Sequence, residues 1–530
     1  MNRLSPPLGA AVLAALLAGC SLAPDYQRPD APVAAAWPDQ PRVQYGQDDP
    51  HATLGRQPAD AVAPGPGVPA AELGWSEFFR DQRLQALIRQ ALAGNRDLRI
   101  AVQRIEEARA QYGIQRGQQF PAIGAGVQGT RQRLPGDMRP GGPDSTSISS
   151  QYQAGIGLTT FEIDLFGRLR SLSEAALQQY LATEQARRSV QINLVGQVAQ
   201  AYFNLRAAEV QLDLTQRTLQ ARQASYDLVK SRFDGGVASE LELNQAKTLL
   251  DTASADLAQF ARSQDQAVNA LVLLLGGPLP ADLPEPAPFG RDQLLATVPA
   301  GLPSDLLERR PDILAAENQL RAANANIGAA RAAFFPTISL TGLLGVASPS
   351  LSDLFDGGRY WSFSPSITTP LFAGGSLRAG LDLARARSNI AVSQYEQAIQ
   401  QAFREVSDAL AGEATYTAQI DALRALEQSS QRTLELSNLR YEGGIDSYLQ
   451  VQTAQVDFFN AQQALVQASL QALANRVELY KALGGGWQET TQVSTGQPAA
   501  AGQPSAQAAP AAGQAVAART GDAPGAAVSR

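Results

Sequence analysis

The sequence predicts an α+β membrane protein built as a tandem repeat, with two membrane-spanning β-strands and very long helices in each copy. Two pairs of motifs reveal the repeat. Phe120-Pro-Ala-Ile returns as Phe335-Pro-Thr-Ile after 215 positions, and Arg232-Phe-Asp-Gly-Gly-Val-Ala-Ser returns as Arg440-Tyr-Glu-Gly-Gly-Ile-Asp-Ser after 208 positions. Long stretches with no proline and almost no glycine lie between these motifs. Elongated repeated units of this kind have no compact pocket of their own, which argues against an enzyme.

The composition supports a helix-rich chain with thin cores and no catalytic chemistry. Charged residues make up 18% and aromatic residues 6% of the 530 residues, and the net charge is 43 − 50 = −7. An acidic chain of this kind offers no basic surface to nucleic acid. One histidine, one cysteine and two methionines provide no ligand set for a transition metal and no nucleophile–histidine pair. We therefore expect no enzymatic activity, no metal and no cofactor.

Residues 1–19 are interpreted as a lipoprotein signal peptide. Their apolar run is shorter than the roughly 20 residues that span a bilayer. The run ends in Leu17-Ala-Gly-Cys20, which looks like a bacterial lipobox, and Cys20 is the only cysteine in the chain. We expect Cys20 to carry a diacylglycerol group and an N-acyl chain such as palmitate, and Ser21 after it points to the outer membrane. The alternative is an ordinary signal peptide with an incidental cysteine.

Composition shifts divide the chain into a tether, two structural repeats, a linker with seven prolines, and a low-complexity tail. The tether is rich in proline and alanine, could wrap the body, and should give way to ordered structure near Trp75. The tail, poor in large apolar residues, is expected to be disordered. The predicted bounds are 20–74 for the lipidated tether, 75–276 for the first repeat, 277–303 for the linker, 304–487 for the second repeat and 488–530 for the tail.

Each repeat begins with a helix and a β-hairpin. Apolar residues at three-to-four spacing predict one amphipathic helix up to about Gly117, and 312–333 is its counterpart in the second copy. Both helices end before a Phe-Pro pair, as the restriction on residues preceding proline favours. Strand-like runs follow at 122–132, 151–164, 337–347 and 360–371. Their length suits the 9–11 or so residues that cross a bilayer at a tilt.

The longest elements come next. Helices are predicted from Ser171 to Asp234 and from Leu377 to Glu442, and about 63 helical residues would extend roughly 95 Å. A second stretch follows each Gly-Gly turn, at 240–275 and 448–483, so each repeat ends in an antiparallel helical hairpin. Residues seven positions apart predict a coiled-coil seam. In the first copy these are Val198, Leu205, Leu212, Leu219, Tyr226 and Phe233, and in the second, less strictly, Val406, Glu413, Ile420, Glu427, Leu434 and Tyr441.

Four strands cannot close a barrel, because spanning barrels begin at eight strands and an open edge in lipid leaves backbone groups unpaired. The chain must therefore oligomerise. Two copies would give eight strands, whose interior is filled by side chains, whereas three copies give a 12-stranded barrel with room for a channel. A conduit function selects the trimer.

Four separated motifs now carry a family resemblance. They are Glu162-Ile-Asp-Leu-Phe-Gly-Arg-Leu-Arg, Leu307-Glu-Arg-Arg-Pro-Asp-Ile, Ala325-Asn-Ile-Gly-Ala-Ala-Arg-Ala-Ala-Phe-Phe-Pro and Pro370-Leu-Phe-Ala-Gly-Gly. They resemble the outer-membrane efflux factor family, the TolC/OprM-like proteins, and especially its lipoprotein branch, over about residues 22–487.

The resemblance implies a homotrimer with a 12-stranded outer-membrane β-barrel and a long periplasmic α-helical barrel. It further implies docking to a periplasmic adaptor and to an inner-membrane transporter of the resistance-nodulation-division type. In that arrangement the protein is a passive conduit for drugs or other small molecules, associated with multidrug resistance. Two alternatives remain: a lipid-anchored coiled-coil structural or adaptor protein without a pore, and a duct for type I protein secretion.

The family's periplasmic tips and adaptor contacts correspond by motif to the two Gly-Gly turns. Glycine supplies the positive φ that a tight interhelical turn requires, so this role alone would also explain the motif. The candidate docking residues are Gly235, Gly236, Val237, Ser239, Gly443, Gly444, Ile445 and Ser447.

The sequence departs from the family at the expected periplasmic constriction. Relatives often place an aspartate in Leu-Asp-Ala-Gln just past the second tip, and Thr453 stands at that position here. A charged ring at Thr453 is therefore not supported. Asp446 or Asp457 could replace it, and Leu449 could form an apolar constriction.

Overall fold

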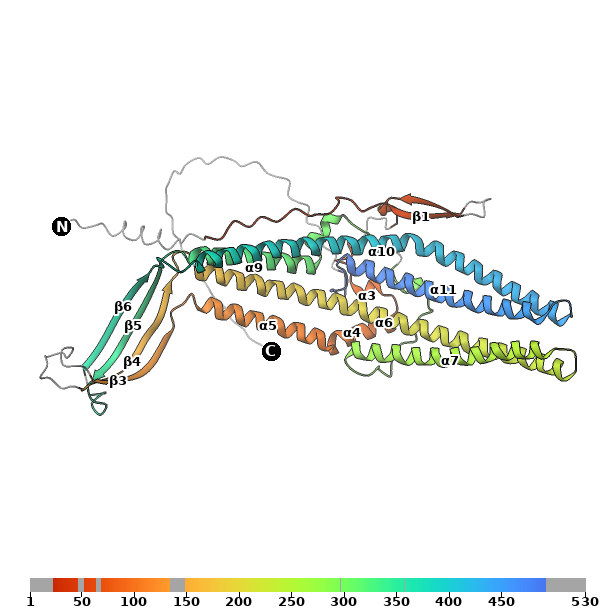
Figure 1. The fold of residues 1–530 in the computed structure, drawn as a ribbon, viewed down its shortest axis with the longest axis horizontal. Helices are drawn as coiled ribbons and strands as arrows, with labels where there is room; N and C mark the ends of the chain where they lie inside the picture. The colour runs from red at the N-terminus through yellow and green to blue at the C-terminus, as the bar shows by residue number, and fades with distance from the viewer. Residues whose placement is uncertain are drawn as a thin grey trace, which may run out of the picture. The chain divides into compact units, whose positions relative to one another are not determined.

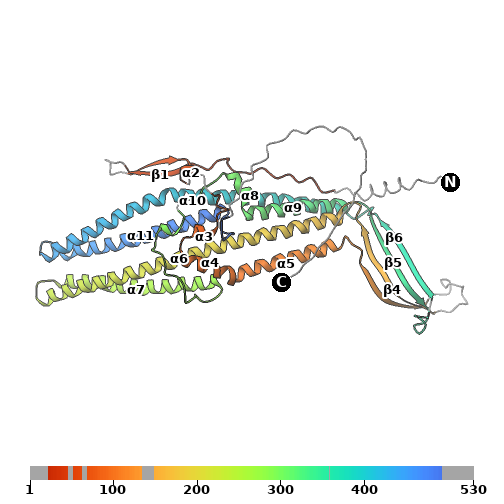
Figure 2. The same cartoon turned by 180° about the vertical axis from the view of Figure 1, so that it is seen from behind.

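The computed structural model describes residues 22–45, 52–62, 68–133, 148–295, 297–356 and 358–491. The expected signal peptide, the lipidation site Cys20 and the tail beyond residue 491 lie outside the described residues. Within the described part, a four-stranded sheet lies at one end of the long helices and the Gly-Gly turns lie at the other (Figures 1 and 2).

Two helices of 67 residues each connect the two ends: α6, Arg168–Asp234, and α10, Ser376–Glu442. In the half nearer the strands they pack with α5, Arg96–Gly117, and α9, Pro311–Ala332, in the order α5–α6–α9–α10. In the half nearer the turns they pack with α7, Glu240–Leu275, and α11, Tyr448–Ala482, in the order α7–α6–α11–α10. The long helical hairpins predicted from the sequence are thus present, and four helices lie abreast at each level.

The four predicted strands form one antiparallel sheet in the order β3–β4–β5–β6. They are β3 (Ile123–Arg133), β4 (Ile148–Ile163), β5 (Thr337–Ser348) and β6 (Gly358–Thr368). The two hairpins join through β4 and β5, so β3 and β6 are the edges. The last strand ends at Thr368 and not at residue 371.

The expectation of one helix up to Gly117 is wrong. The chain forms α4, Gln82–Gly94, and then α5, because Asn95 between them adopts an extended conformation with ψ of 135°. The Asn95 side chain accepts from the N–H of Leu98 at 3.0 Å and donates to the carbonyl of Leu274 at 2.9 Å. The break therefore fastens the start of α5 to the end of α7. The second copy has a similar break between α8, Leu306–Arg309, and α9.

The predicted start of order at Trp75 is also wrong. Before Trp75 the chain forms an antiparallel pair, β1 (Gln40–Tyr45) and β2 (Ala52–Gln57), and a short helix at Ala59–Val62 (α2); a further short helix begins at Trp75 (α3, Trp75–Phe78). Residues 22–40, here the N-terminal strap, bind along α9 and α10. Trp37 stacks on Phe403 of α10 with ring centroids 5.0 Å apart. The sequence did not predict this order, because the segment has few apolar residues and is ordered by tertiary contacts with α9 and α10.

The predicted tail begins with a docked segment. The N–H of Trp75 donates to the carbonyl of Gln488 at 2.9 Å, and Arg89 pairs with Glu489 at 2.9 Å. Thr491 donates its hydroxyl to Glu77 at 2.5 Å. Residues 488–491 therefore belong with the body, contrary to the expectation of disorder from residue 488.

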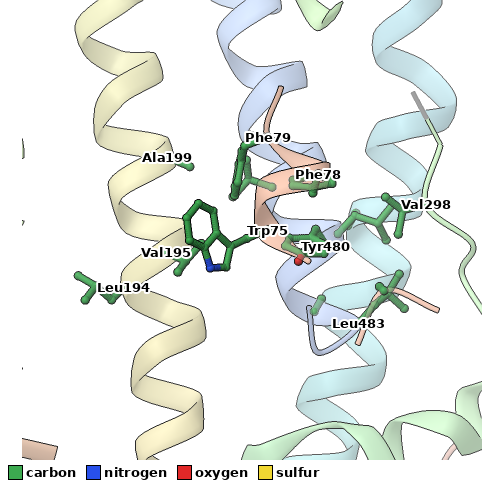
Figure 3. Packing of buried hydrophobic residues seen from close by; sticks show 14 of the residues in the cluster. Trp75, Phe78, Phe79, Leu194, Val195, Ala199, Val298, Tyr480 and Leu483 are labelled. Carbon is green, nitrogen blue, oxygen red and sulfur yellow. The ribbon is translucent and has the colours of Figure 1, made fainter. Parts of the chain in front are cut away.

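The largest core lies where α3, α6, α11 and the inter-repeat segment meet. Phe78 stacks on Tyr480 with ring centroids 4.0 Å apart, and the Tyr480 hydroxyl donates to the carbonyl of Leu73 at 2.6 Å. Figure 3 shows these rings between α6 residues such as Val195 and the inter-repeat residue Val298. The inter-repeat segment, which includes two 3-10 helices at Arg291–Gln293 and Pro303–Asp305, thus contributes to the core.

The predicted coiled-coil line of the first copy is not the most buried one. Towards the tip of α6, the buried positions are Ala208, Thr215, Arg222 and Val229. They also repeat every seven residues, but three positions later than Leu205 and its successors, and Phe233 is exposed. In the second copy the predicted line contains buried Val406, Ile420 and Tyr441. The period was predicted correctly, whereas the contact line in α6 depends on packing against both α7 and α11.

A buried carboxylate holds the N-terminal strap. Glu317 on α9 is 3% exposed and pairs with Arg28 of the strap at 2.8 Å and with Arg321 at 2.7 Å. Burial alone would raise the pKa of Glu317, but hydrogen bonds from the two guanidinium groups outweigh burial and lower it. The Tyr26 hydroxyl also donates to Glu317 at 3.2 Å, and burial together with the nearby carboxylate raises the pKa of Tyr26 to about 12.

We expect Glu317→Gln to release the strap, because it removes charge-assisted hydrogen bonds worth about 2 kcal/mol. Amide hydrogens of residues 22–40 should exchange faster in this variant. In the control Glu308→Gln, at an exposed position of α8, their exchange rate should not change. Since folding lowers the pKa of Glu317 below 4.5, the wild-type strap should stay protected above that value. Protection should disappear as the pH falls through the lowered pKa. Unchanged protection in Glu317→Gln would contradict this role.

Candidate functional site

The sheet has one face of aliphatic and aromatic side chains over most of its length. Paired residues fix its composition: Ala125, Ile156, Leu344 and Trp361 lie side by side on successive strands, and residues two positions away share their face. In β4 a register shift between Leu158 and Phe161 reverses this alternation, so Glu162 pairs with Ser339 of the other face. We call this the apolar face, and its apolar members include Ile123, Ala125, Val127, Ala154, Ile156, Leu158, Ile338, Leu340, Leu344, Val346, Trp361, Phe363 and Ile367. Trp361 is 73% exposed and Leu344 is 69% exposed, so much of this face is uncovered among the residues that the structure describes. Near the far end of the sheet, Ala154 is buried and Phe355 of the β5–β6 connection lies beside it.

The opposite face, here the polar face, carries mainly glycine, hydroxyl and amide side chains. Its members include Gly124, Gly126, Gln128, Thr130, Gln151, Gln153, Gly155, Gly157, Ser339, Thr341, Gly345, Ser362, Ser364, Ser366 and Thr368. Within the described strands, the only charged residue on the polar face is Glu162, at the helix end of β4. A Cβ added at Gly345 would lie 2.0 Å from the carbonyl oxygen of Ala154, so the close approach of β4 and β5 requires glycine there.

Contiguous exposed apolar surface of this extent marks a membrane or protein contact. Strands of 11 to 16 residues are long enough for the 9–11 or so residues that cross a bilayer at a tilt. Among the residues that the structure describes, no helix is both long enough and apolar enough to cross a membrane. The sheet therefore has the properties of a membrane-spanning wall with one face to lipid and one to water.

The Glu162-Ile-Asp-Leu-Phe-Gly-Arg motif joins this wall to α6. Glu162 pairs with Arg168 through bonds of 2.9 and 2.5 Å, and Asp164 accepts from the backbone N–H of Arg170 at 2.8 Å. Gly167 between them has φ of 73°, a conformation that favours glycine. The motif thus turns the chain from β4 into the helix and neutralises the one carboxylate on the polar face.

The Leu307-Glu-Arg-Arg-Pro-Asp-Ile motif fastens the second repeat in a similar way. Buried Arg310 pairs with Asp312 at 2.6 Å and with Glu405 of α10 at 2.8 Å. It also donates to the carbonyl of Ala482 at the end of α11 at 3.0 Å. One side chain therefore connects α9, α10 and α11.

The two Gly-Gly turns at the far ends of the helices have the same backbone geometry. Gly236 and Gly444 have φ of 76° and 71°, whereas the glycines before them keep helical values of φ. The N–H of Val237 donates to the carbonyl of Arg232 at 2.9 Å, and Ile445 donates to Arg440 at the same distance. The sequence therefore correctly identified matching turns, although only the second glycine of each requires a positive φ.

The side chains at the two turns differ more than their backbones. Val237 and Ile445 are equivalent and expose 72% and 67% of their surface. Ser239 forms a capping box with Glu242 at the start of α7. Ser447 occupies the corresponding N-cap of α11 but makes no side-chain capping bond. The docking role of these residues stays a prediction.

The candidate constriction residues lie at the second turn and along the first turns of α11. Asp446 is bound by Arg440 through two bonds of 2.6 and 3.0 Å, and this pairing lowers the pKa of Asp446. Leu449 is 51% exposed, and Thr453 donates its hydroxyl to the carbonyl of Leu449 at 3.0 Å. Asp457 is exposed farther along the helix. Their roles at an entrance also stay predictions.

Two arginines that the sequence reasoning missed organise the turns. Arg232 lies over the Tyr441 ring at 4.6 Å and donates to the Tyr441 carbonyl at 3.4 Å, which links α6 to α10. Arg440 holds Asp446, as described above. The sequence could have indicated both arginines, because each repeated Gly-Gly motif begins with an arginine.

Comparison with known proteins identifies a match over most of the ordered chain. The family model described as "Outer membrane efflux protein" matches residues 87–277 and 302–485. The chain is 49% identical over 485 residues to the antibiotic efflux pump outer membrane protein ArpC of Pseudomonas putida, covering 91% of this chain and 96% of the relative. It has the same identity and coverage with the toluene efflux pump outer membrane protein TtgC of Pseudomonas putida. The crystal structure of the open state of the MtrE outer membrane channel of Neisseria gonorrhoeae is similar with a TM-score of 0.77 and 39% identity, covering 89% of this chain and all of that one.

The two glycines of the first turn should respond differently to substitution. We expect Gly236→Ala to destabilise the turn by about 1–2 kcal/mol, because alanine disfavours the left-handed conformation. Gly235→Ala is the matched control, since Gly235 has φ of −81° and an added Cβ would come no closer than 3.3 Å to a neighbouring atom. Hydrogen exchange at Val237 and Ala238 should accelerate more in Gly236→Ala, and equal acceleration would contradict the assignment.

Asp446 and Asp457 should contribute unequally to any cation site at an entrance. Arg440 already neutralises Asp446, so we expect Asp457→Asn to weaken block of single-channel current by a trivalent cation more than Asp446→Asn does. Single-channel recording with increasing blocker concentration measures the difference. Unchanged block in both variants would remove both aspartates from the entrance.

Proposed function

The chain belongs to the outer membrane efflux protein family, and we propose that three copies form the channel through which an efflux pump releases small molecules across the outer membrane. The trimer is inferred from the properties of the four-stranded sheet. It has one apolar face, one polar face whose single carboxylate, Glu162, is paired with Arg168, and two free edges, β3 and β6, of 11 residues each. A sheet edge inside a bilayer must be paired, because lipid offers no hydrogen-bond partner.

Pairing β6 of one copy with β3 of the next closes twelve strands from three copies. The same symmetry gives twelve helices at both helical levels, since each chain contributes four. A barrel of twelve helices can therefore continue a barrel of twelve strands with the same three subunits. Two copies would give eight strands, whose interior is filled by side chains.

The channel is proposed to act passively and not as an enzyme. Its lining would come from the polar face, whose hydroxyl, amide and glycine groups can accompany a solute but do not favour either sign of charge. Energy for export would come from partners, which we propose to be a periplasmic adaptor and an inner-membrane transporter of the resistance-nodulation-division type. The exposed Val237 and Ile445 make the two turns suitable contacts for the adaptor. The names of the relatives favour antibiotics and small apolar solvents as cargo.

The protein is an outer-membrane protein, and we propose that a lipid on Cys20 adds a second attachment. The strap supports this arrangement, because Arg331 on α9 donates to the carbonyl of Leu22 at 3.1 Å and Asn324 donates to that of Pro24 at 2.7 Å. Two residues after Cys20, the chain is thus already fixed beside the strand end of α9. An acyl chain attached there would enter the membrane leaflet next to the sheet.

Native mass spectrometry of the detergent-extracted protein, followed by planar-bilayer recording, tests the proposal. We expect a trimer whose current becomes cation-selective in Gln153→Glu and anion-selective in Gln153→Lys, because three charges would then stand on the lumen wall. Gln153→Asn should leave selectivity unchanged. A purely monomeric protein, or selectivity indifferent to all three changes, would refute the proposed channel.

A further inference from the structure

Three arginines occupy the apolar face at its end farthest from the helices. Arg131 and Arg133 are on β3, at the alternate positions that include Ile123 and Val127, and Arg359 is on β6, two positions before Trp361. All three side chains are exposed. None of them has an acidic partner among the residues that the structure describes. They contrast with Glu162 on the polar face, which Arg168 neutralises.

Their position along the strands places them at the level of a membrane interface. Arg131 follows Ile123 by eight positions on β3, and Arg359 precedes Ile367 by eight on β6, so each lies roughly 26 Å along its strand from an isoleucine at the helix end. A charged residue on the lipid face is least costly near the interface. Trp361 and Tyr152, aromatic side chains of the same face, lie close to this level, as in an interfacial girdle.

Closure of the barrel brings the arginines together. They are on the two edge strands, β3 and β6, and none is on β4 or β5. When β6 of one copy pairs with β3 of the next so that their helix-side isoleucines, Ile367 and Ile123, lie at the same level, Arg359 of one copy comes near Arg131 and Arg133 of the other. Three like charges at one seam repel each other unless an anion binds between them.

We propose that each of the three seams binds a phosphate group of a lipid in the outer leaflet of the outer membrane. Guanidinium groups bind phosphate oxygens through paired hydrogen bonds, and several arginines surround one phosphate better than a single arginine does. The site belongs to a lipid and not to free phosphate, because exposed Trp361 and Val127 lie below the arginines and would contact acyl chains. This inference rests on the proposed function, since a single chain does not bring the three arginines together.

The test is lipid binding by the purified full-length trimer, with bis-phosphorylated lipid A as the probe and native mass spectrometry as the readout. We expect up to three lipids per trimer in the wild type. Arg131→Gln/Arg133→Gln/Arg359→Gln should bind on the order of a hundredfold more weakly, from about fivefold per arginine. Arg359→Gln alone should lose about fivefold, which keeps the test valid if the triple variant assembles poorly.

The matched control is Arg217→Gln/Arg262→Gln/Arg424→Gln, which removes the same charge from exposed helical positions and should bind like the wild type. Equal binding by the wild type, the triple variant and Arg359→Gln would overturn the inference. Equal binding of dephosphorylated lipid A, or displacement of the lipid by inorganic phosphate, would overturn it too. The same spectra separate the two proposals: a trimer without lipid contradicts only the seam site, whereas absence of the trimer contradicts the channel as well.

Discussion

The free edges of one four-stranded sheet are the constraint on which this structure depends. A strand edge in water can bind solvent, but an edge in hydrocarbon must bind another strand. In the channel proposed above, the apolar face of β3 to β6 lies in the membrane, and the two edges therefore require further copies of the chain. On this proposal, oligomerisation is a condition for inserting the sheet, and the lumen is a consequence of closing it.

The helices follow from the same constraint. Four strands arrive at the junction, and four helices lie abreast on its other side, so a closed wall can continue from the membrane into the periplasm. The junction also removes charge from the wall: Arg168 binds Glu162, and Gly167 turns the chain without a side chain in the way. Farther along, α5 and α9 end and α7 and α11 take their places, which keeps the number of helices constant. The core around Phe78 and Tyr480 lies at the level where α7 and α11 replace α5 and α9.

Sequence patterns predicted the elements whose causes are local. The strand-length runs after the Phe-Pro pairs, the lack of helix breakers from Ser171 to Asp234 and the repeated Gly-Gly pairs were sufficient for the strands, the long helices and the matching turns. Features caused by distant contacts were not predictable in this way. Asn95 ends a helix because its side chain reaches Leu274, and the strap is ordered because Glu317 is buried beneath Arg28. For the candidate site, the residues at the turns were found from the repeat, but the pairing of Asp446 with Arg440 requires the folded turn.

Duplication allows the two helical hairpins to share a backbone and differ in how they pack. The turns have nearly equal dihedral angles, yet Tyr441 is buried beside Tyr448 whereas its counterpart Phe233 is exposed. Arg232 of the first hairpin lies over the Tyr441 ring of the second. The equivalent Arg440 of the second hairpin instead binds Asp446 in its own turn, so the two hairpins contact each other through different residues. In the ring proposed above, α6 meets α11 within a chain, whereas α10 would meet α7 of the next copy, so the two kinds of contact differ. A ring with two kinds of contact can loosen one kind while the other holds the assembly together, which a ring of identical hairpins cannot do.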